Sequence, residues 1–111
     1  MDFSFSDEQT LLQDSIGKFI QNDYSFADRQ KIVKTELGFS KKNWGTFAEL
    51  GWLGVPFTEA DGGFGGTAVD GMIVMEQFGK GLVIEPFVAT VILAGGALKL
   101  AGSPEQKNRY L

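Results

Sequence analysis

Apolar residues recur at helical spacing from the beginning of the chain. Ser6 precedes the first such segment and Gln9 follows three residues later, which is the pattern of a capping box. Apolar positions then follow at i, i+4, i+7 and i+8 spacing, namely Leu12, Ile16, Phe19 and Ile20. Because this spacing places them on one face of a helix, the sequence predicts a helix over 7–22.

Two further helices are predicted before position 51. Ser25 and Asp28 begin the second, which has one apolar edge and one charged face, and Gly38 is expected to end it. Ser40 begins the third, and Gly51 follows its last residues, where a left-handed residue commonly terminates a helix. Both segments are short, but each is bounded by a cap residue and a glycine.

The stretch 50–66, LGWLGVPFTEADGGFGG, interrupts the helical pattern. It is rich in glycine, and Pro56 has no backbone N–H to donate to a regular helix or sheet. We expect it to form a shaped connector between two layers of helical structure.

The chain after this connector is more apolar. Thr67 and Asp70 repeat the cap pattern and begin a fourth helix, which is expected to end at Gly79. Pro86 suits the first turn of a fifth helix, which is apolar nearly all round until Gly102.

A last helix is predicted at the end of the sequence. Ser103 is its cap, Pro104 occupies its first position and Gln106 completes a capping box. No segment alternates with period two, as a half-buried strand would. The fold class predicted from these patterns is therefore all-α, an orthogonal bundle of five helices and a short sixth within one domain over 1–111.

Composition excludes several classes of function. The net charge is −4 and the sequence has no extended basic run, which argues against nucleic-acid binding. Cysteine and histidine are absent, which removes disulfides, thiolate nucleophiles, histidine-based triads and Cys/His zinc sites. The amino terminus lacks the features of a signal or transit peptide, and the apolar run 87–98 is shorter than the ~20 residues of a membrane span. We expect a cytoplasmic protein that binds no membrane.

The glycine run 62–66 has two interpretations. Glycine-rich turns before a helix can present backbone N–H groups to a phosphate. The run lacks the Lys-Ser/Thr pair of a Walker loop, and neither a strand pattern nor the glycine register of a dinucleotide fingerprint precedes Thr67. A structural turn is therefore favoured over a phosphate loop.

The acidic residues near and after the connector are the candidate acid–base groups, and spacing identifies no partner for any of them: Glu59, Asp61, Asp70, Glu76 and Glu85. Glu85 precedes an apolar helix, where either a ligand or the helix dipole could use its charge, and the dipole interpretation is favoured. The aromatic residues Trp44, Trp52 and Phe57 could stack on a flavin or a base, but core packing is the stronger interpretation. No catalytic constellation follows from these residues.

Four segments in order resemble the amino-terminal helical domain of the acyl-CoA dehydrogenase family. They are FSDEQTLLQDSIGKF (5–19), AELGWLGVPFTEADGGFGG (48–66), MEQFG (75–79) and AGSPEQKNRYL (101–111). Their order extends over nearly the whole chain, from position 5 to position 111. The segments YSFADR (24–29) and GKGLVIEPF (79–87) are more closely similar to small subunits of the pimeloyl-CoA dehydrogenase type.

The resemblance implies a longer flavoenzyme of fatty acid metabolism. Such an enzyme binds FAD, removes hydrogens from Cα and Cβ of an acyl-CoA thioester and passes electrons to an electron-transfer flavoprotein, commonly as a homo- or hetero-oligomer. In the family, a β-barrel domain and a carboxy-terminal helical domain follow this segment and supply the flavin contacts and the catalytic base. Residues 1–111 alone are therefore expected to contain no catalytic or flavin-binding residue and to be inactive.

The same resemblance implies that this domain walls the distal end of the acyl pocket, at Glu85, Ala89, Thr90 and Leu93. Small residues on an apolar helix suit a fatty acyl slot, but they equally suit close packing of helices, and both interpretations remain open. Two other functions also remain open. One is an acyl-CoA oxidase or flavin monooxygenase of the same fold, and the other is a stand-alone helical module that docks a partner protein.

Overall fold

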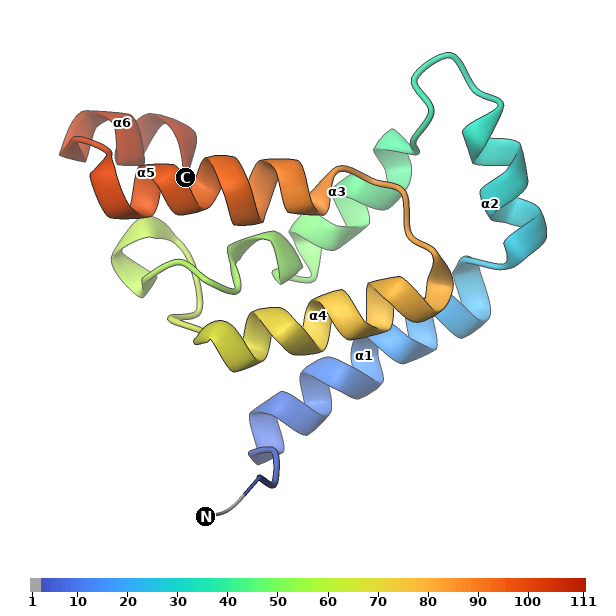
Figure 1. The fold of residues 1–111 in the computed structure, drawn as a ribbon, viewed down its shortest axis with the longest axis horizontal. Coiled ribbons are helices and arrows are strands. Elements are labelled where there is room, and N and C mark those ends of the chain that lie inside the picture. Colours follow the sequence, from blue (N-terminus) through green and yellow to red (C-terminus); the bar gives the residue numbers. More distant parts are fainter. Residues whose placement is uncertain (1–2) are drawn as a thin grey trace. The chain divides into compact units, whose positions relative to one another are not determined.

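The computed structural model describes residues 3–111, and every regular element in this range is helical (Figure 1). Its α-helices are α1 (Asp7–Asp23), α2 (Phe26–Val33), α3 (Lys41–Glu49), α4 (Ala68–Gly81), α5 (Gly95–Ala101) and α6 (Pro104–Tyr110). Two short 3-10 turns, η1 (Trp52–Gly54) and η2 (Glu59–Asp61), lie in the glycine-rich connector. A π-helix, η3 (Val88–Ala94), precedes α5 without a break. The predicted all-α class is confirmed.

The chain forms two compact units. The first comprises the described residues up to Phe39 together with Val69–Ile84, and the second comprises Ser40–Ala68 together with Glu85–Leu111. The chain passes between the units at three places, so each unit is built from two separate stretches of sequence.

Four of the predicted helix starts are confirmed by cap hydrogen bonds that span three residues. The hydroxyls of Ser6, Ser25, Ser40 and Ser103 each accept a bond from the backbone N–H three positions later. Ser6 and Ser103 also form complete capping boxes, because the Gln side chain at the third position accepts from the cap residue's N–H. Such a bond joins close neighbours in sequence, which is why the pattern alone predicts it.

Two helix ends differ from the prediction. The second helix ends at Val33 rather than at Gly38, because the N–H and hydroxyl of Thr35 both donate to the carbonyl of Ile32 and close a tight turn. The positive φ of Gly38, 73°, belongs to the loop that follows. A threonine able to bond back to the last helical turn ended this helix before the glycine was reached.

The end of α4 is also later than predicted, at Gly81 rather than Gly79. Leu82 takes the left-handed conformation, with φ of 53°, and its N–H donates to the carbonyl of Gly79. The N–H of Val83 donates to the carbonyl of Phe78. These bonds are those of a Schellman motif, in which a leucine occupies the position that glycine usually takes.

In the first unit, α1 and α4 lie side by side (Figure 1). A Cβ added to Gly81 would lie 2.8 Å from Cγ2 of Ile20, and one added to Gly17 would lie 3.4 Å from Oε1 of Gln77. Small residues therefore allow the two helices to approach closely. The phenol of Tyr24, a buried residue at the end of α1, accepts a 3.1 Å hydrogen bond from the N–H of Ile84.

The core of the second unit is aromatic. Phe47 of α3 lies with its ring centroid 5.3 Å from that of Trp52 and 6.3 Å from that of Trp44. Trp52 and Phe57 are buried, as the sequence predicts, and so is Phe47, whereas Trp44, also predicted to lie in the core, is half-buried. Lys99 of α5 donates from Nζ to the carbonyl of Pro56 at 2.9 Å and so ties α5 to the connector.

Candidate functional site

The glycine-rich connector uses its own backbone amides. The five N–H groups from Gly62 to Gly66 all donate to backbone carbonyls of residues 54–59, at distances between 2.6 and 3.2 Å. A phosphate loop requires amides that point at the ligand and are free to donate to it. The structural turn is therefore the correct interpretation of this run, and it is no cradle for the pyrophosphate of a dinucleotide such as FAD.

Gly63 shows how tightly this connector is folded. A Cβ at this position would overlap the carbonyl oxygens of Phe57 and Gly54, so no side chain fits there. The backbone of Phe57 is held within this connector, because its N–H donates to the carbonyl of Gly54 and its carbonyl accepts from the N–H of Gly65. A Cβ at Gly95 would likewise overlap Cζ of Phe57, so the ring lies directly on the backbone of α5.

Glu85 is the buried acid of the second unit, with only 4% of its surface exposed. Its Oε2 accepts a 2.9 Å hydrogen bond from the N–H of Ser40, the cap residue of α3. Its other oxygen, Oε1, is buried and has no hydrogen-bond partner. The side chain therefore interacts with the start of α3, a helix other than the one that Glu85 precedes.

The other residues predicted to wall an acyl pocket lie on η3 and are exposed. They are Ala89, Thr90 and Leu93, and the side chain of Leu93 is 64% exposed. Val91 and Gly95 are buried on the inner side of the same continuous helix. The structure thus leaves Ala89, Thr90 and Leu93 accessible together and separates Glu85 from them by burying it beside Ser40.

The π-helical geometry of this segment was not predicted from sequence. The N–H of Gly95 donates to the carbonyl of Thr90, five residues earlier, which is the bond that defines a π-turn. Such turns are rare in proteins overall, and a large share of those that occur lie at functional sites. No spacing of apolar residues distinguishes an apolar π-helix from an apolar α-helix, so the sequence offered no signal for it.

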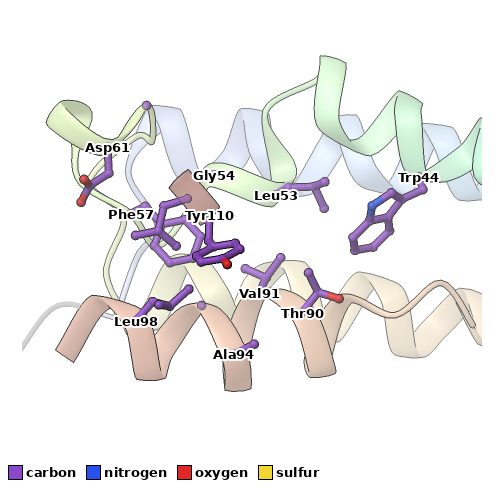
Figure 2. A pocket seen from close by; sticks show the side chains of 13 residues that line it. Trp44, Leu53, Gly54, Phe57, Asp61, Thr90, Val91, Ala94, Leu98 and Tyr110 are labelled. Atoms are coloured by element: carbon purple, nitrogen blue, oxygen red, sulfur yellow. The ribbon is translucent and has the colours of Figure 1, made fainter. Parts of the chain in front are cut away.

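The second unit contains an open cavity of about 540 Å³, whose lining includes the exposed residues Thr90, Ala94 and Tyr110 (Figure 2). One wall comes from the helix formed by η3 and α5, through Thr90, Val91, Ala94 and Leu98. The opposite wall comes from α3 and the connector, and Tyr110 of α6 also lines the space, with its ring beside Phe57 in the view of Figure 2. We call this space the unit-2 cavity.

Polar groups are few in the unit-2 cavity. Asp61 and Trp44 lie at opposite ends in the view of Figure 2, and Thr90 lies at the same end as Trp44. Asp61 is the one acid whose side chain lines the cavity, and none of the lining side chains is basic. Sequence reasoning assigned Trp44 and Phe57 to the core and missed this space, because the residues that enclose it are distant in sequence.

Residues 3–111 offer neither a clustered metal site nor a membrane-spanning helix. No cluster of three or more acidic side chains in this range could hold a metal ion. None of the helices described is long and apolar enough to cross a membrane.

Comparison with known proteins identifies the family. Residues 6–111 match the model of the acyl-CoA dehydrogenase N-terminal domain. The chain is 28% identical to a short-chain-specific acyl-CoA dehydrogenase of Clostridium acetobutylicum over 116 residues, and 28% identical to a probable acyl-CoA dehydrogenase of Bacillus subtilis over 113. It is also 28% identical over 112 residues to an acryloyl-CoA reductase (NADH) of Anaerotignum propionicum.

These matches cover the whole of this chain but only 28–29% of each relative, so the chain spans less than a third of the relatives' length. No solved structure is significantly similar to it. The family match extends over all six α-helices and the connector between them. The chain therefore belongs to the acyl-CoA dehydrogenase family, and its sequence corresponds to the amino-terminal helical domain.

Proposed function

We propose that this chain is the amino-terminal domain of an FAD-dependent enzyme that oxidises the Cα–Cβ bond of acyl-CoA thioesters, and that η3 forms part of the wall of the acyl pocket. Two of the three relatives are named dehydrogenases, which supports oxidation. The third is named an acryloyl-CoA reductase, and its substrate carries a Cα–Cβ double bond. All three names thus describe oxidation or reduction of a CoA thioester.

The observation that carries the pocket assignment is the exposed, uncharged surface of the helix formed by η3 and α5. No charged residue occurs between Glu85 and Lys99. Ala89, Thr90 and Leu93 are accessible on this surface, and Ile92 and Val88 are partly exposed beside them. An apolar surface with small residues suits contact with an alkyl chain, because burying each methylene group is worth about 0.8 kcal/mol.

The buried carboxylate of Glu85 has a positioning role in this proposal. By accepting from Ser40 N–H, it fixes the start of η3 against the start of α3 within the second unit. That contact would fix the positions of Ala89 and Leu93 relative to a bound acyl chain. Glu85 itself would contact α3 rather than substrate.

The flavin sites of the enzyme are proposed to lie outside this chain. The connector amides are engaged in backbone hydrogen bonds, and the unit-2 cavity has no basic lining side chain to oppose a pyrophosphate. When bound to the complete enzyme, FAD would supply the electron sink for the hydrogens removed from substrate, and an electron-transfer flavoprotein would be the next acceptor. The role of these residues is to shape and shield the acyl pocket.

The test uses the complete polypeptide that contains this sequence, purified with its flavin and assayed with acyl-CoA thioesters of increasing length. Leu93→Phe adds bulk to the proposed wall, so kcat/KM for the longest accepted thioester should fall by about tenfold or more relative to the shortest. Leu100→Phe is the matched control, because Leu100 is exposed on the same helix and is no part of the proposed wall. An unchanged chain-length profile for Leu93→Phe would remove η3 from the pocket, and absence of acyl-CoA oxidation by the unmutated enzyme would overturn the function itself.

A further inference from the structure

We propose that the unit-2 cavity is a binding site in its own right, for an uncharged aliphatic molecule that carries one hydroxyl or carbonyl group. The cavity is about 540 Å³, within the ~300–1,000 Å³ range of small-molecule sites. It lies within one compact unit, since every residue that lines it belongs to Ser40–Ala68 or Glu85–Leu111. The proposal is independent of the acyl-pocket assignment, because it concerns binding by this chain without flavin.

The residues that line the cavity favour an apolar ligand. Phe57, Val91 and Leu98 present aromatic and aliphatic side chains to the space, and Figure 2 shows Phe57 and Val91 between its two ends. The rings of Trp44 and Tyr110 add further apolar surface. A ligand gains about 25 cal/mol for each Å² of apolar surface that it removes from water here.

One wall of the cavity, at Phe57, is held in place by its contacts with the backbone. Phe57 cannot turn towards α5, because its ring already lies against the backbone of Gly95, where a Cβ would overlap it. Phe57 is itself held by the connector, whose backbone donates from Gly65 to the Phe57 carbonyl at 2.6 Å. The Phe57 side of the space is therefore fixed by backbone contacts.

The polar residues of the lining favour an uncharged ligand. Thr90 offers a hydroxyl that can donate to, or accept from, a single polar group of a ligand. Asp61 lies at the other end, where its Oδ2 accepts a 3.1 Å hydrogen bond from the Thr58 hydroxyl. With an acid and no base among the lining side chains, a carboxylate or phosphate in the cavity would be repelled, whereas an alcohol would not.

The inferred site differs from the proposed acyl-pocket wall. Ala89 and Leu93 are not among the residues that line the cavity, and Val91, Ala94 and Leu98 are. Thr90 alone belongs to both sets. The helix formed by η3 and α5 would therefore present two apolar surfaces, one facing outward and one facing the cavity.

The test is calorimetric titration of the 111-residue chain with 1-octanol, and with octanoate as an anion of equal chain length, while tryptophan fluorescence, measured in a Trp52→Phe background so that it comes from Trp44, reports occupancy. We expect saturable octanol binding and at least tenfold weaker octanoate binding. Asp61→Asn should narrow that difference to less than threefold. Failure to detect octanol binding up to its solubility limit, or equal affinity for both probes, would overturn the proposal.

Two variants of matched size locate the binding. Ala94→Phe places a ring in the cavity and should weaken octanol binding at least tenfold, whereas Ala97→Phe, on the same helix but outside the lining, should leave it within twofold. Leu93→Glu should also leave it within twofold, which separates the cavity from the exposed apolar surface. Circular dichroism establishes that each variant keeps its helicity. Equal effects of the two Phe substitutions, or loss of binding in Leu93→Glu, would show that octanol binds the outer surface and would contradict the assignment.

Discussion

The carboxylate of Glu85 and the backbone N–H of Ser40 are 2.9 Å apart, although 45 positions separate the two residues in the sequence. Both lie where the chain enters the second unit, Ser40 after Phe39 and Glu85 after Ile84. The bond joins these two entry points within that unit. It also places a negative charge at the amino terminus of α3, where the helix dipole is positive.

Glu85→Ala should destabilise the chain by about 1 to 2 kcal/mol, because it leaves the partly buried N–H of Ser40 without its acceptor. Glu85→Gln keeps an oxygen for that bond and should cost about 1 kcal/mol or less. Urea unfolding followed by circular dichroism measures both values. Glu36→Ala, a change of an exposed acid in the loop after α2, is the control and should alter stability by less than ~0.5 kcal/mol. Equal losses for Glu85→Ala and Glu85→Gln would mean that the hydrogen bond is not what stabilises this contact.

The same pair of residues shows what the sequence could and could not predict. Ser40 was identified as a cap because its hydroxyl accepts from Asn43, three residues later, and such local bonds leave a pattern in sequence. The interaction of Glu85 with Ser40 leaves no such pattern, because it depends on a tertiary contact between residues that are 45 positions apart. Sequence alone therefore assigned Glu85 to the dipole of the adjoining helix or to a ligand, and did not identify α3.

The same difference between local and long-range interactions separates the candidate sites that the sequence predicts from those that it does not. The turn at Gly62–Gly66 was predicted correctly because the phosphate motifs have fixed local spacing that this run lacks. The unit-2 cavity was not predicted, because Trp44, Phe57 and Thr90 come from distant parts of the chain. Ala89, Thr90 and Leu93 came from family resemblance, and their role in an acyl pocket stays a prediction.

Gly63→Ala should destabilise the chain by about 3 kcal/mol or prevent folding. Its Cβ would overlap the carbonyl oxygens of Phe57 and Gly54, which are backbone atoms and cannot move away without breaking connector hydrogen bonds. The matched control is Gly71→Ala in α4, where an added Cβ meets no atom within 4 Å. Removing a helical glycine there should stabilise the chain by up to ~1 kcal/mol. Thermal unfolding of both variants decides the point, and a Gly63→Ala protein of normal stability would show that the connector can rearrange.

Leu82→Gly should increase stability by about 0.5 to 1 kcal/mol, although it removes an apolar side chain. Leu82 is exposed and has φ of 53°, a conformation that costs a non-glycine residue roughly 1–2 kcal/mol. The greater freedom of glycine in the unfolded chain offsets about half of the gain. The hydrogen bond from Arg29 Nε to the Leu82 carbonyl, 2.6 Å long, involves only the backbone of position 82 and should persist.

The control for this prediction is Leu11→Gly. Leu11 is similarly exposed but lies inside α1, so the change should cost about 1 kcal/mol. Urea titrations of the two variants should thus shift in opposite directions. A loss of stability in Leu82→Gly comparable to that of Leu11→Gly would mean that the side chain of Leu82 contributes more than its conformation costs.

The exposed apolar surface of η3 and α5 should make the 111-residue chain self-associate. Leu93 is 64% exposed and Leu100 is 87% exposed, and the helix carries no charge between Glu85 and Lys99 to keep copies apart. Exposed apolar patches larger than a few hundred Å² are uncommon on monomeric proteins and usually mark an interaction surface. In the longer enzyme proposed above, the remainder of the polypeptide would cover this surface. A monodisperse monomer at high concentration that binds no hydrophobic dye would contradict this prediction.

Leu93→Glu tests whether this helix is the surface that associates. Two copies that meet along η3 would bury the new carboxylate without a partner, so the association constant should fall by at least tenfold. Helicity and unfolding free energy should stay nearly unchanged, because position 93 is exposed within one chain. Light scattering after size exclusion measures association, and circular dichroism on the same samples separates it from unfolding. Leu11→Glu introduces the same charge at a similarly exposed position on α1 and should leave association intact, so an equal effect of both substitutions would point to net charge rather than to η3.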